Sequence, residues 1–191
     1  MEYIDQEILK KDTSIEYLKI NKENFYKISN SDGIRPFFMS IVSDSNHWIF
    51  ISSNGGLSAG RKNAEYALFP YYTDDKITES SEITGSKSIF LVNKHGHSQI
   101  WEPFSNHYEG LHNISRNLYK NEYGNKVMFE EINHDLNLTY RYQWSSSNLY
   151  GFVKESTIIN HNENPLSISL VDGIQNILPY GVGSDLQSQS S

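Results

Sequence analysis

Most of the side chains in this sequence that could bind a ligand lie between Ser52 and Ile77. This segment reads SSNGGLSAGRKNAEYALFPYYTDDKI and mixes amide, guanidinium, phenol and carboxylate groups after a pair of glycines. The candidate ligand-binding or interface residues in it are Asn54, Arg61, Asn63, Tyr71, Tyr72, Asp74 and Asp75.

Arg61 is the sharpest of these candidates. It follows Gly60, where the backbone can adopt angles that other residues avoid. A guanidinium at this point can grip a phosphate or a carboxylate through paired N–H groups. The favoured alternative is that Arg61 ties the loop down by contacting Asp74 or Asp75.

Aromatic rings indicate carbohydrate as a ligand, because they match the flat apolar faces of pyranose sugars. Tyr71 and Tyr72 follow a proline in a predicted loop, so we expect at least one exposed ring. Trp101 precedes a Glu-Pro pair that ends its strand, which places the ring near a rim and adds it to the candidates. Trp48 and Trp144 lie within predicted strands, and we expect both rings in the core.

Paired carboxylates, a common device for cleaving glycosides, are not apparent. Glu130 and Glu131 are neighbours in a predicted strand, so they point to opposite faces of its sheet. Asp74 and Asp75 are best explained as turn- or helix-capping residues. We therefore expect no catalytic residue in this chain.

The histidines form no recognisable metal-binding motif. His95 and His97 flank a turn glycine, and His107 and His112 follow without a carboxylate at a diagnostic spacing. The chain also has no nucleophile elbow, phosphate-binding loop or dinucleotide fingerprint. We expect neither a metal nor a cofactor.

Composition narrows the class of partner. With 191 residues the chain suits one domain, and its net charge of -7 argues against a nucleic-acid partner. It contains no cysteine, no signal peptide is visible, and no apolar run approaches the ~20 residues that a membrane span needs. We expect a soluble, cytoplasmic protein with no membrane partner.

Alternating side chains predict strands. The clearest case is LNLTYRYQW, Leu136–Trp144, whose large apolar residues all fall on one face. Similar short runs, separated by turn-forming segments, give eight or nine strands and predict an all-β, antiparallel β-sandwich with little helix. A helical turn or two is expected only in Glu2–Lys11 and near Asn113–Tyr119.

The order of these segments resembles the N-terminal β-supersandwich domain of cellobiose phosphorylase-like glycoside hydrolases and phosphorylases, which has the galactose mutarotase-like fold. The resemblance covers roughly Pro36–Val182 and divides the chain into an N-terminal segment (1–35), a whole or partial sandwich (36–182) and a polar tail (183–191). The segments that carry it are SSNGGLSAGR, FPYYTDDKI, SIFLVNKHGHSQIWEPF, YGNKVMFEEINHDLNLTYRYQW and VKESTIINHNENPLSISLVDGIQNILPYGV.

The resemblance implies a non-catalytic domain of a larger carbohydrate-active enzyme. In that family a separate C-terminal helical domain holds the catalytic acid, and the sandwich acts as scaffold, interface and, in some cases, part of the substrate site. It implies that the segment from Asn54 to Asp75 faces the helical domain or an oligosaccharide. A partial sandwich would also leave an unpaired edge strand, which favours a homodimer.

Two alternatives stay open at this point. A free-standing carbohydrate-binding module needs only exposed aromatic rings and polar loops. A mutarotase-type sugar epimerase would need a carboxylate and histidines that converge on a concave sheet face. The sequence offers few strand histidines for this purpose, since His47 opens a strand and His134 lies in a turn.

Overall fold

Alternating side chains build an inner strand of the largest sheet. In β11 (Leu138–Ser147), Tyr140, Tyr142 and Trp144 are buried, whereas Arg141 and Gln143 between them are half-buried. The strand predicted at Leu136–Trp144 is therefore confirmed, with Leu136 buried in the turn before it. This one-sided burial orients the sheet toward the core.

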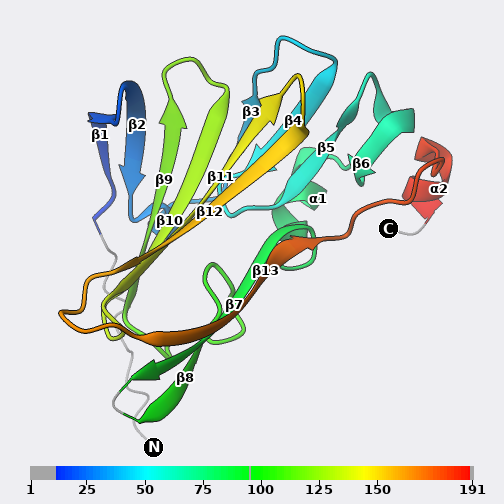
Figure 1. The fold of residues 1–191 in the computed structure, drawn as a ribbon. Coiled ribbons are helices and arrows are strands. Elements are labelled where there is room, and N and C mark those ends of the chain that lie inside the picture. Colours follow the sequence, from blue (N-terminus) through cyan, green and yellow to red (C-terminus); the bar gives the residue numbers. More distant parts are fainter. Residues whose placement is uncertain (1–11, 95, 190–191) are drawn as a thin grey trace, which may run out of the picture.

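The computed structural model describes residues 12–94 and 96–189 and is an all-β antiparallel sandwich built from three sheets (Figure 1). The six-stranded sheet has the order β1 (Ser14–Ile20), β2 (Glu23–Ser29), β9 (Ile114–Asn121), β10 (Lys126–Asn133), β11 and β12 (Gly151–Asn160). The four-stranded sheet contains β3 (Phe38–Ile41), β4 (His47–Ser52), β5 (Leu57–Arg61) and β6 (Ala67–Phe69). The three-stranded sheet has the order β13 (Ser167–Gln175), β7 (Gly85–Lys94) and β8 (His97–Trp101).

Helices are short. They are α1 (Asp74–Glu79), α2 (Ser184–Gln189) and the 3₁₀ turns η1 (Ser31–Gly33), η2 (Ala64–Tyr66) and η3 (Ser80–Glu82). In the part of the chain that the structure describes, no helix has both the length and the apolarity to cross a membrane.

Several sequence expectations need correction. The helical turn expected near Asn113–Tyr119 is wrong, because this segment forms β9 between β2 and β10. β1 and β2 belong to the six-stranded sheet, so the boundary expected at Pro36 does not separate them from the sandwich. The polar tail contains α2, in which Gln187 is buried. The helix expected at Glu2–Lys11 lies outside the described residues.

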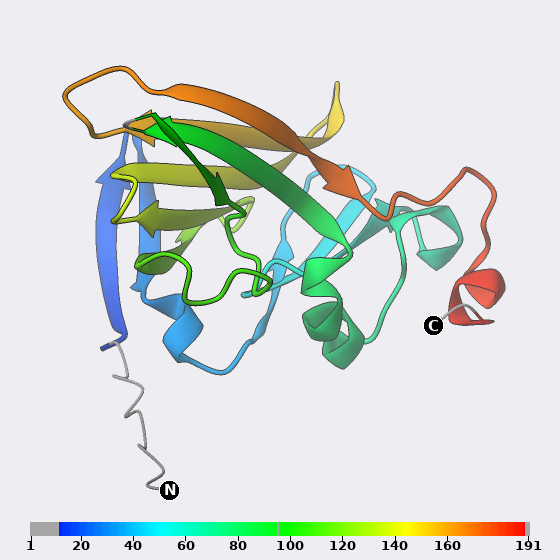
Figure 2. The same ribbon diagram turned by 90° about the horizontal axis from the view of Figure 1, so that it is seen from below.

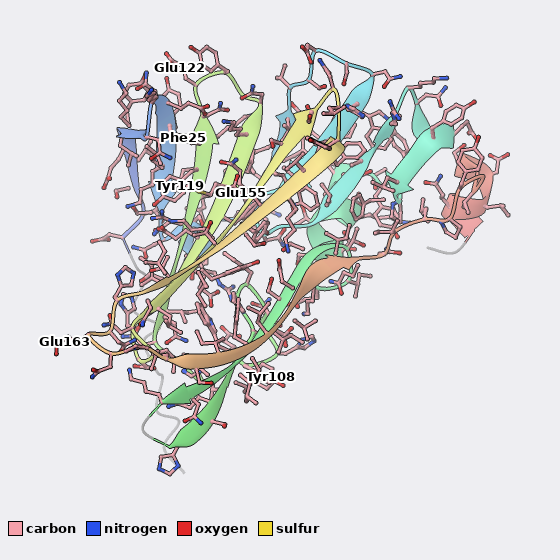
Figure 3. The ribbon with its side chains drawn as sticks, in the orientation of Figure 1. Phe25, Tyr108, Tyr119, Glu122, Glu155 and Glu163 are labelled. Atoms are coloured by element: carbon pink, nitrogen blue, oxygen red, sulfur yellow. The ribbon has the colours of Figure 1, made fainter. Side chains whose placement is uncertain are left out.

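The main core consists of aromatic and aliphatic side chains between the three sheets. Phe129 stacks on Tyr142 with ring centroids 4.8 Å apart, and Phe90 packs against Trp101 at 5.3 Å. A second, smaller cluster lies on the other face of the six-stranded sheet, where Phe25 on β2 and Tyr119 on β9 lie near each other (Figure 3). Figure 2 shows β7 and β13 running side by side.

The turn between β4 and β5 brings the backbone close to α1. Gly55 has a φ of 95°, and its N–H donates to the carbonyl of Ser52 at 2.9 Å. A Cβ atom added to Gly56 would lie 1.8 Å from the carbonyl oxygen of Ile77, a contact that the backbone would have to relieve by moving. Only glycine fits at position 56.

Replacing this glycine tests the packing of the turn. We expect Gly56→Ala to lower the free energy of unfolding by about 2 kcal/mol or more, because overpacking forces the backbone apart. The matched control is Gly173→Ala in β13, where an added Cβ would meet no atom within 4 Å. The control should change stability by less than about 1 kcal/mol. Urea unfolding measures both, and equal effects would contradict the close packing of Gly56.

Candidate functional site

The segment from Asn54 to Asp75 is not one loop but a turn, two strands, a 3₁₀ turn and the start of α1. Asn54 belongs to the turn, where its amide donates to the carbonyl of Thr78 at 2.9 Å and ties the turn to α1. Asn63 precedes η2, and its side-chain oxygen accepts a hydrogen bond from the backbone N–H of Glu65 at 3.2 Å. Both residues therefore position neighbouring elements.

The two aspartates lie in the first turn of α1, and Thr73 before them is its N-cap residue. The Thr73 hydroxyl donates to the carboxylate of Asp75, which also accepts from the backbone N–H of Lys76 at 2.9 Å. These hydrogen bonds lower the pKa of the Asp75 carboxyl. The alternative in which Arg61 pairs with an aspartate is wrong for the described residues, because the Arg61 Nε atom donates to the side chain of Asn46 at 3.4 Å.

The aromatic candidates separate into exposed and buried rings. Tyr71 is exposed and meets Trp48 edge-on, with centroids 5.6 Å apart, while Tyr72 is half-buried. Trp101 is only 2% exposed, so the rim position expected for its ring is wrong. Its indole nitrogen donates to Glu131 at 2.7 Å, which places it in the core. Trp144 is buried as predicted.

A separate group of tyrosines surrounds a cavity of about 820 Å³ between three parts of the chain. Tyr66 comes from η2, Tyr150 precedes β12, and Tyr180 lies between β13 and α2. We call this space the tyrosine cavity, and the residues that line it are Asn46, His47, Arg61, Lys62, Glu65, Tyr66, Ala67, Leu68, Tyr150, Gly151, Phe152, Leu178, Tyr180, Gly181 and Val182. Of the sequence candidates, Arg61 alone lines it.

The pairing of β4 with β5 places two of the polar residues that line this cavity. His47 on β4 is the cross-strand partner of Arg61 on β5. Partial burial lowers the pKa of His47, and the positive charge of Arg61 lowers it further. The carboxylate of Glu65 accepts hydrogen bonds from the backbone N–H of Ser184, at 3.2 Å, and from its hydroxyl. The Glu65 bonds attach the segment after β13 to the 3₁₀ turn.

A second cavity, of about 440 Å³, lies beside the loop after β8. Glu131 lies at its base and is 1% exposed. The Glu131 carboxylate accepts from the indole of Trp101, from the backbone N–H of Phe104 at 2.7 Å, and from Arg116 Nε at 2.8 Å. Arg116 also donates to the carbonyl of Ser105 at 2.9 Å. Both charged groups are thus used to hold the loop against the sheet.

The two neighbouring glutamates do point to opposite faces, as expected from their spacing. Glu130 accepts on the other face from Asn117 at 2.7 Å, from the Tyr119 hydroxyl at 2.8 Å and from Arg141 at 2.5 Å. Burial opposes ionisation of Glu130, but these donors outweigh it, and the pKa of its carboxyl is lowered. Neither carboxylate is free to act as a general acid.

Three residues near the second cavity have the geometry of a cation site. Ligand atoms of Glu82, Glu102 and His107 lie within 4.8 Å of one another. The ammonium group of Lys87 contacts both carboxylates, however, and lies 3.4 Å from Glu82. One of the two negative charges is therefore already compensated by a lysine, and these contacts help to hold the loop after β8.

Comparison with known proteins gives no family for this chain. No protein-family model matches the sequence, and no curated protein matches it. The structure thus defines the class as an all-β antiparallel sandwich, and the resemblance to cellobiose phosphorylase-like domains remains a prediction.

Replacing Glu131 by glutamine tests the hydrogen-bond network around its carboxylate. Glu131→Gln leaves Arg116 without its counter-charge and turns an amide NH₂ toward groups that are all donors. We expect the free energy of unfolding to fall by roughly 3–5 kcal/mol. Glu163→Gln, in the exposed turn between β12 and β13 (Figure 3), is the control and should change it by less than about 0.5 kcal/mol. Similar urea midpoints for both variants would contradict the network.

Proposed function

We propose that this chain is a non-catalytic sandwich domain of a larger carbohydrate-active enzyme and that it binds a saccharide in the tyrosine cavity. The observation that carries the proposal is the make-up of this cavity. Tyr66, Tyr150 and Tyr180 are 48%, 78% and 98% exposed, an unusual concentration of accessible rings on one cavity. Aromatic walls with a few polar groups are typical of sites for small polar ligands.

The polar groups of the cavity suit sugar hydroxyls. The side-chain oxygens of Asn46 and Glu65 are hydrogen-bond acceptors. Among the described residues, Arg61 donates a side-chain hydrogen bond to Asn46 alone, so its other N–H groups can donate to a ligand. Hydroxyl groups both donate and accept, so one ring can satisfy all three side chains while its apolar face meets a tyrosine. This combination favours a saccharide over a purely apolar ligand.

The hydrogen bonds of the two buried carboxylates support a binding role over a catalytic one. Glu131 and Glu130 each accept three hydrogen bonds, including one from an arginine. In the second cavity, His112 Nε2 lies 2.8 Å from the carbonyl of Ile100 and donates to it. A mutarotase-type mechanism needs a free carboxylate and a free imidazole, so this arrangement gives it no support.

A specific observation also favours the scaffold and interface part of the proposal. β13 pairs with β7 on one side, and within the described residues no strand pairs with its other side. Its side chains Leu170 and Val171 are 54% and 70% exposed. Exposed edges with apolar side chains are templates for strand pairing, so we propose that this edge contacts the helical catalytic domain of the parent enzyme and, in the isolated chain, a second copy.

Titration calorimetry with neutral gluco-oligosaccharides tests saccharide binding. We expect binding at millimolar or lower concentration, weakened about three- to tenfold by Tyr150→Ala, because a lost ring contact has this effect. Tyr123→Ala, an equally exposed tyrosine in the turn between β9 and β10, is the matched control and should bind normally. Absence of heat with every neutral and acidic oligosaccharide, or equal effects of both variants, would refute the proposed site.

Light scattering tests the edge of β13. We expect the isolated chain to form a homodimer, and Val171→Lys to make it monomeric because an edge lysine opposes strand pairing. Ile15→Lys on β1, the outer strand of the six-stranded sheet, should leave the dimer intact. A monomeric wild-type chain at high concentration would rule out self-association, and dissociation by Ile15→Lys alone would place the contact on β1.

A further inference from the structure

Two consecutive cationic residues line the same wall of the tyrosine cavity. Consecutive residues of a regular strand point to opposite faces, so Arg61 and Lys62 would normally diverge. Lys62 instead has a φ of 59°, in the left-handed region that non-glycine residues rarely adopt. This turn of the backbone at the end of β5 lets both side chains line one cavity.

Asn46, which directly precedes β4, accepts hydrogen bonds from both residues. Its backbone carbonyl accepts from the N–H of Lys62 at 2.8 Å, and its side-chain oxygen accepts from Arg61 Nε. The Lys62 ammonium lies over the Tyr66 ring, 5.1 Å from its centroid. These contacts place the backbone of Lys62 and the guanidinium of Arg61 at the cavity, and both side chains are exposed to a ligand.

The cavity does not supply an equal negative charge. Among the described residues that line it, Glu65 alone is acidic, and both oxygens of its carboxylate accept from Ser184. No ion pair of Arg61 or Lys62 with a carboxylate occurs in residues 12–94 and 96–189. A protein with a net charge of -7 thus presents two cations against one carboxylate, beside three exposed tyrosines.

From this arrangement we infer that the tyrosine cavity prefers an acidic saccharide, with the ring of a sugar against the tyrosines and its anionic group on Arg61 and Lys62. The inference rests on the proposed carbohydrate function and adds the charge of the ligand. A planar guanidinium matches a carboxylate through two parallel hydrogen bonds, and a lysine beside it adds a second charge. A carboxylate on a uronic acid and a sulfate ester share this chemistry.

The test compares oligosaccharides of equal length by titration calorimetry: a neutral gluco-oligosaccharide, an oligouronate and a sulfated oligosaccharide. We expect an acidic ligand to bind at least about tenfold more tightly than the neutral one, since hydrogen bonds to charged groups contribute this much. Raising the salt concentration should weaken the acidic ligands and leave the neutral one unchanged. Whichever acidic ligand binds more tightly identifies the anionic group.

Substitutions separate the charge preference from saccharide binding itself. Arg61→Ala should lower the affinity for the acidic ligand much more than the affinity for the neutral ligand, which loses only uncharged hydrogen bonds, and should thereby remove most of the acidic preference. Lys62→Asn, which tolerates the left-handed backbone, should reduce this preference. Arg35→Ala, an exposed arginine outside the cavity, is the control. Equal affinity for neutral and acidic ligands, or an acidic preference that survives Arg61→Ala, would overturn the inference and leave the proposed function standing. No binding of any ligand would refute both.

Discussion

Hydrogen-bond donors from three different segments converge on the carboxylate of Glu131, and the joining of two sheets depends on them. Trp101 comes from β8 of the three-stranded sheet, Arg116 from β9 of the six-stranded sheet, and the N–H of Phe104 from the loop between them. A carboxylate that is 1% exposed is costly unless its charge is paired and its oxygens are satisfied. The network meets both conditions and orients the loop that follows β8.

A second polar link joins the same two sheets. Asp172 on β13 accepts from Ser88 on β7 at 2.6 Å, from the Tyr140 hydroxyl on β11 at 3.0 Å and from Lys154 on β12 at 2.5 Å. Burial raises the pKa of Tyr140 to about 12, so its hydroxyl stays protonated and able to donate. The aromatic core joins these two sheets to the four-stranded sheet, whose β4 and β5 form one wall of the tyrosine cavity. The start of β12 and the segment after β13 form the other walls.

The sequence predicted what depends on local patterns. Alternation in Leu136–Trp144 and the opposed directions of Glu130 and Glu131 follow from periodicity, and the structure confirms both. It did not predict what depends on distant pairing. β9 has no clear alternation, and its strand structure comes from β2 and β10 on either side. Trp101 seemed exposed because a proline follows it, but Glu131, 30 residues later, provides its buried partner.

The residues of the candidate site were also predicted only in part. Arg61 was identified from its chemistry and its glycine neighbour, whereas Lys62, Tyr150 and Tyr180 were missed. The two tyrosines are separated from Arg61 by about ninety residues or more of sequence. The position of β12 brings Tyr150 to the cavity. Tyr180 follows Leu178, whose backbone N–H donates to the carbonyl of Leu68 at 2.8 Å. Clusters of tyrosines in turns carry no local signal of a shared cavity.

Backbone amide NMR shifts recorded during a titration with oligosaccharides test whether the tyrosine cavity is the proposed saccharide site. We expect the largest shifts on amides around the cavity, such as those of Lys62, Tyr66 and Gly151, and we expect these shifts to saturate together. Shifts confined to the loop after β8, or no shifts with any neutral or acidic oligosaccharide, would contradict the proposed site.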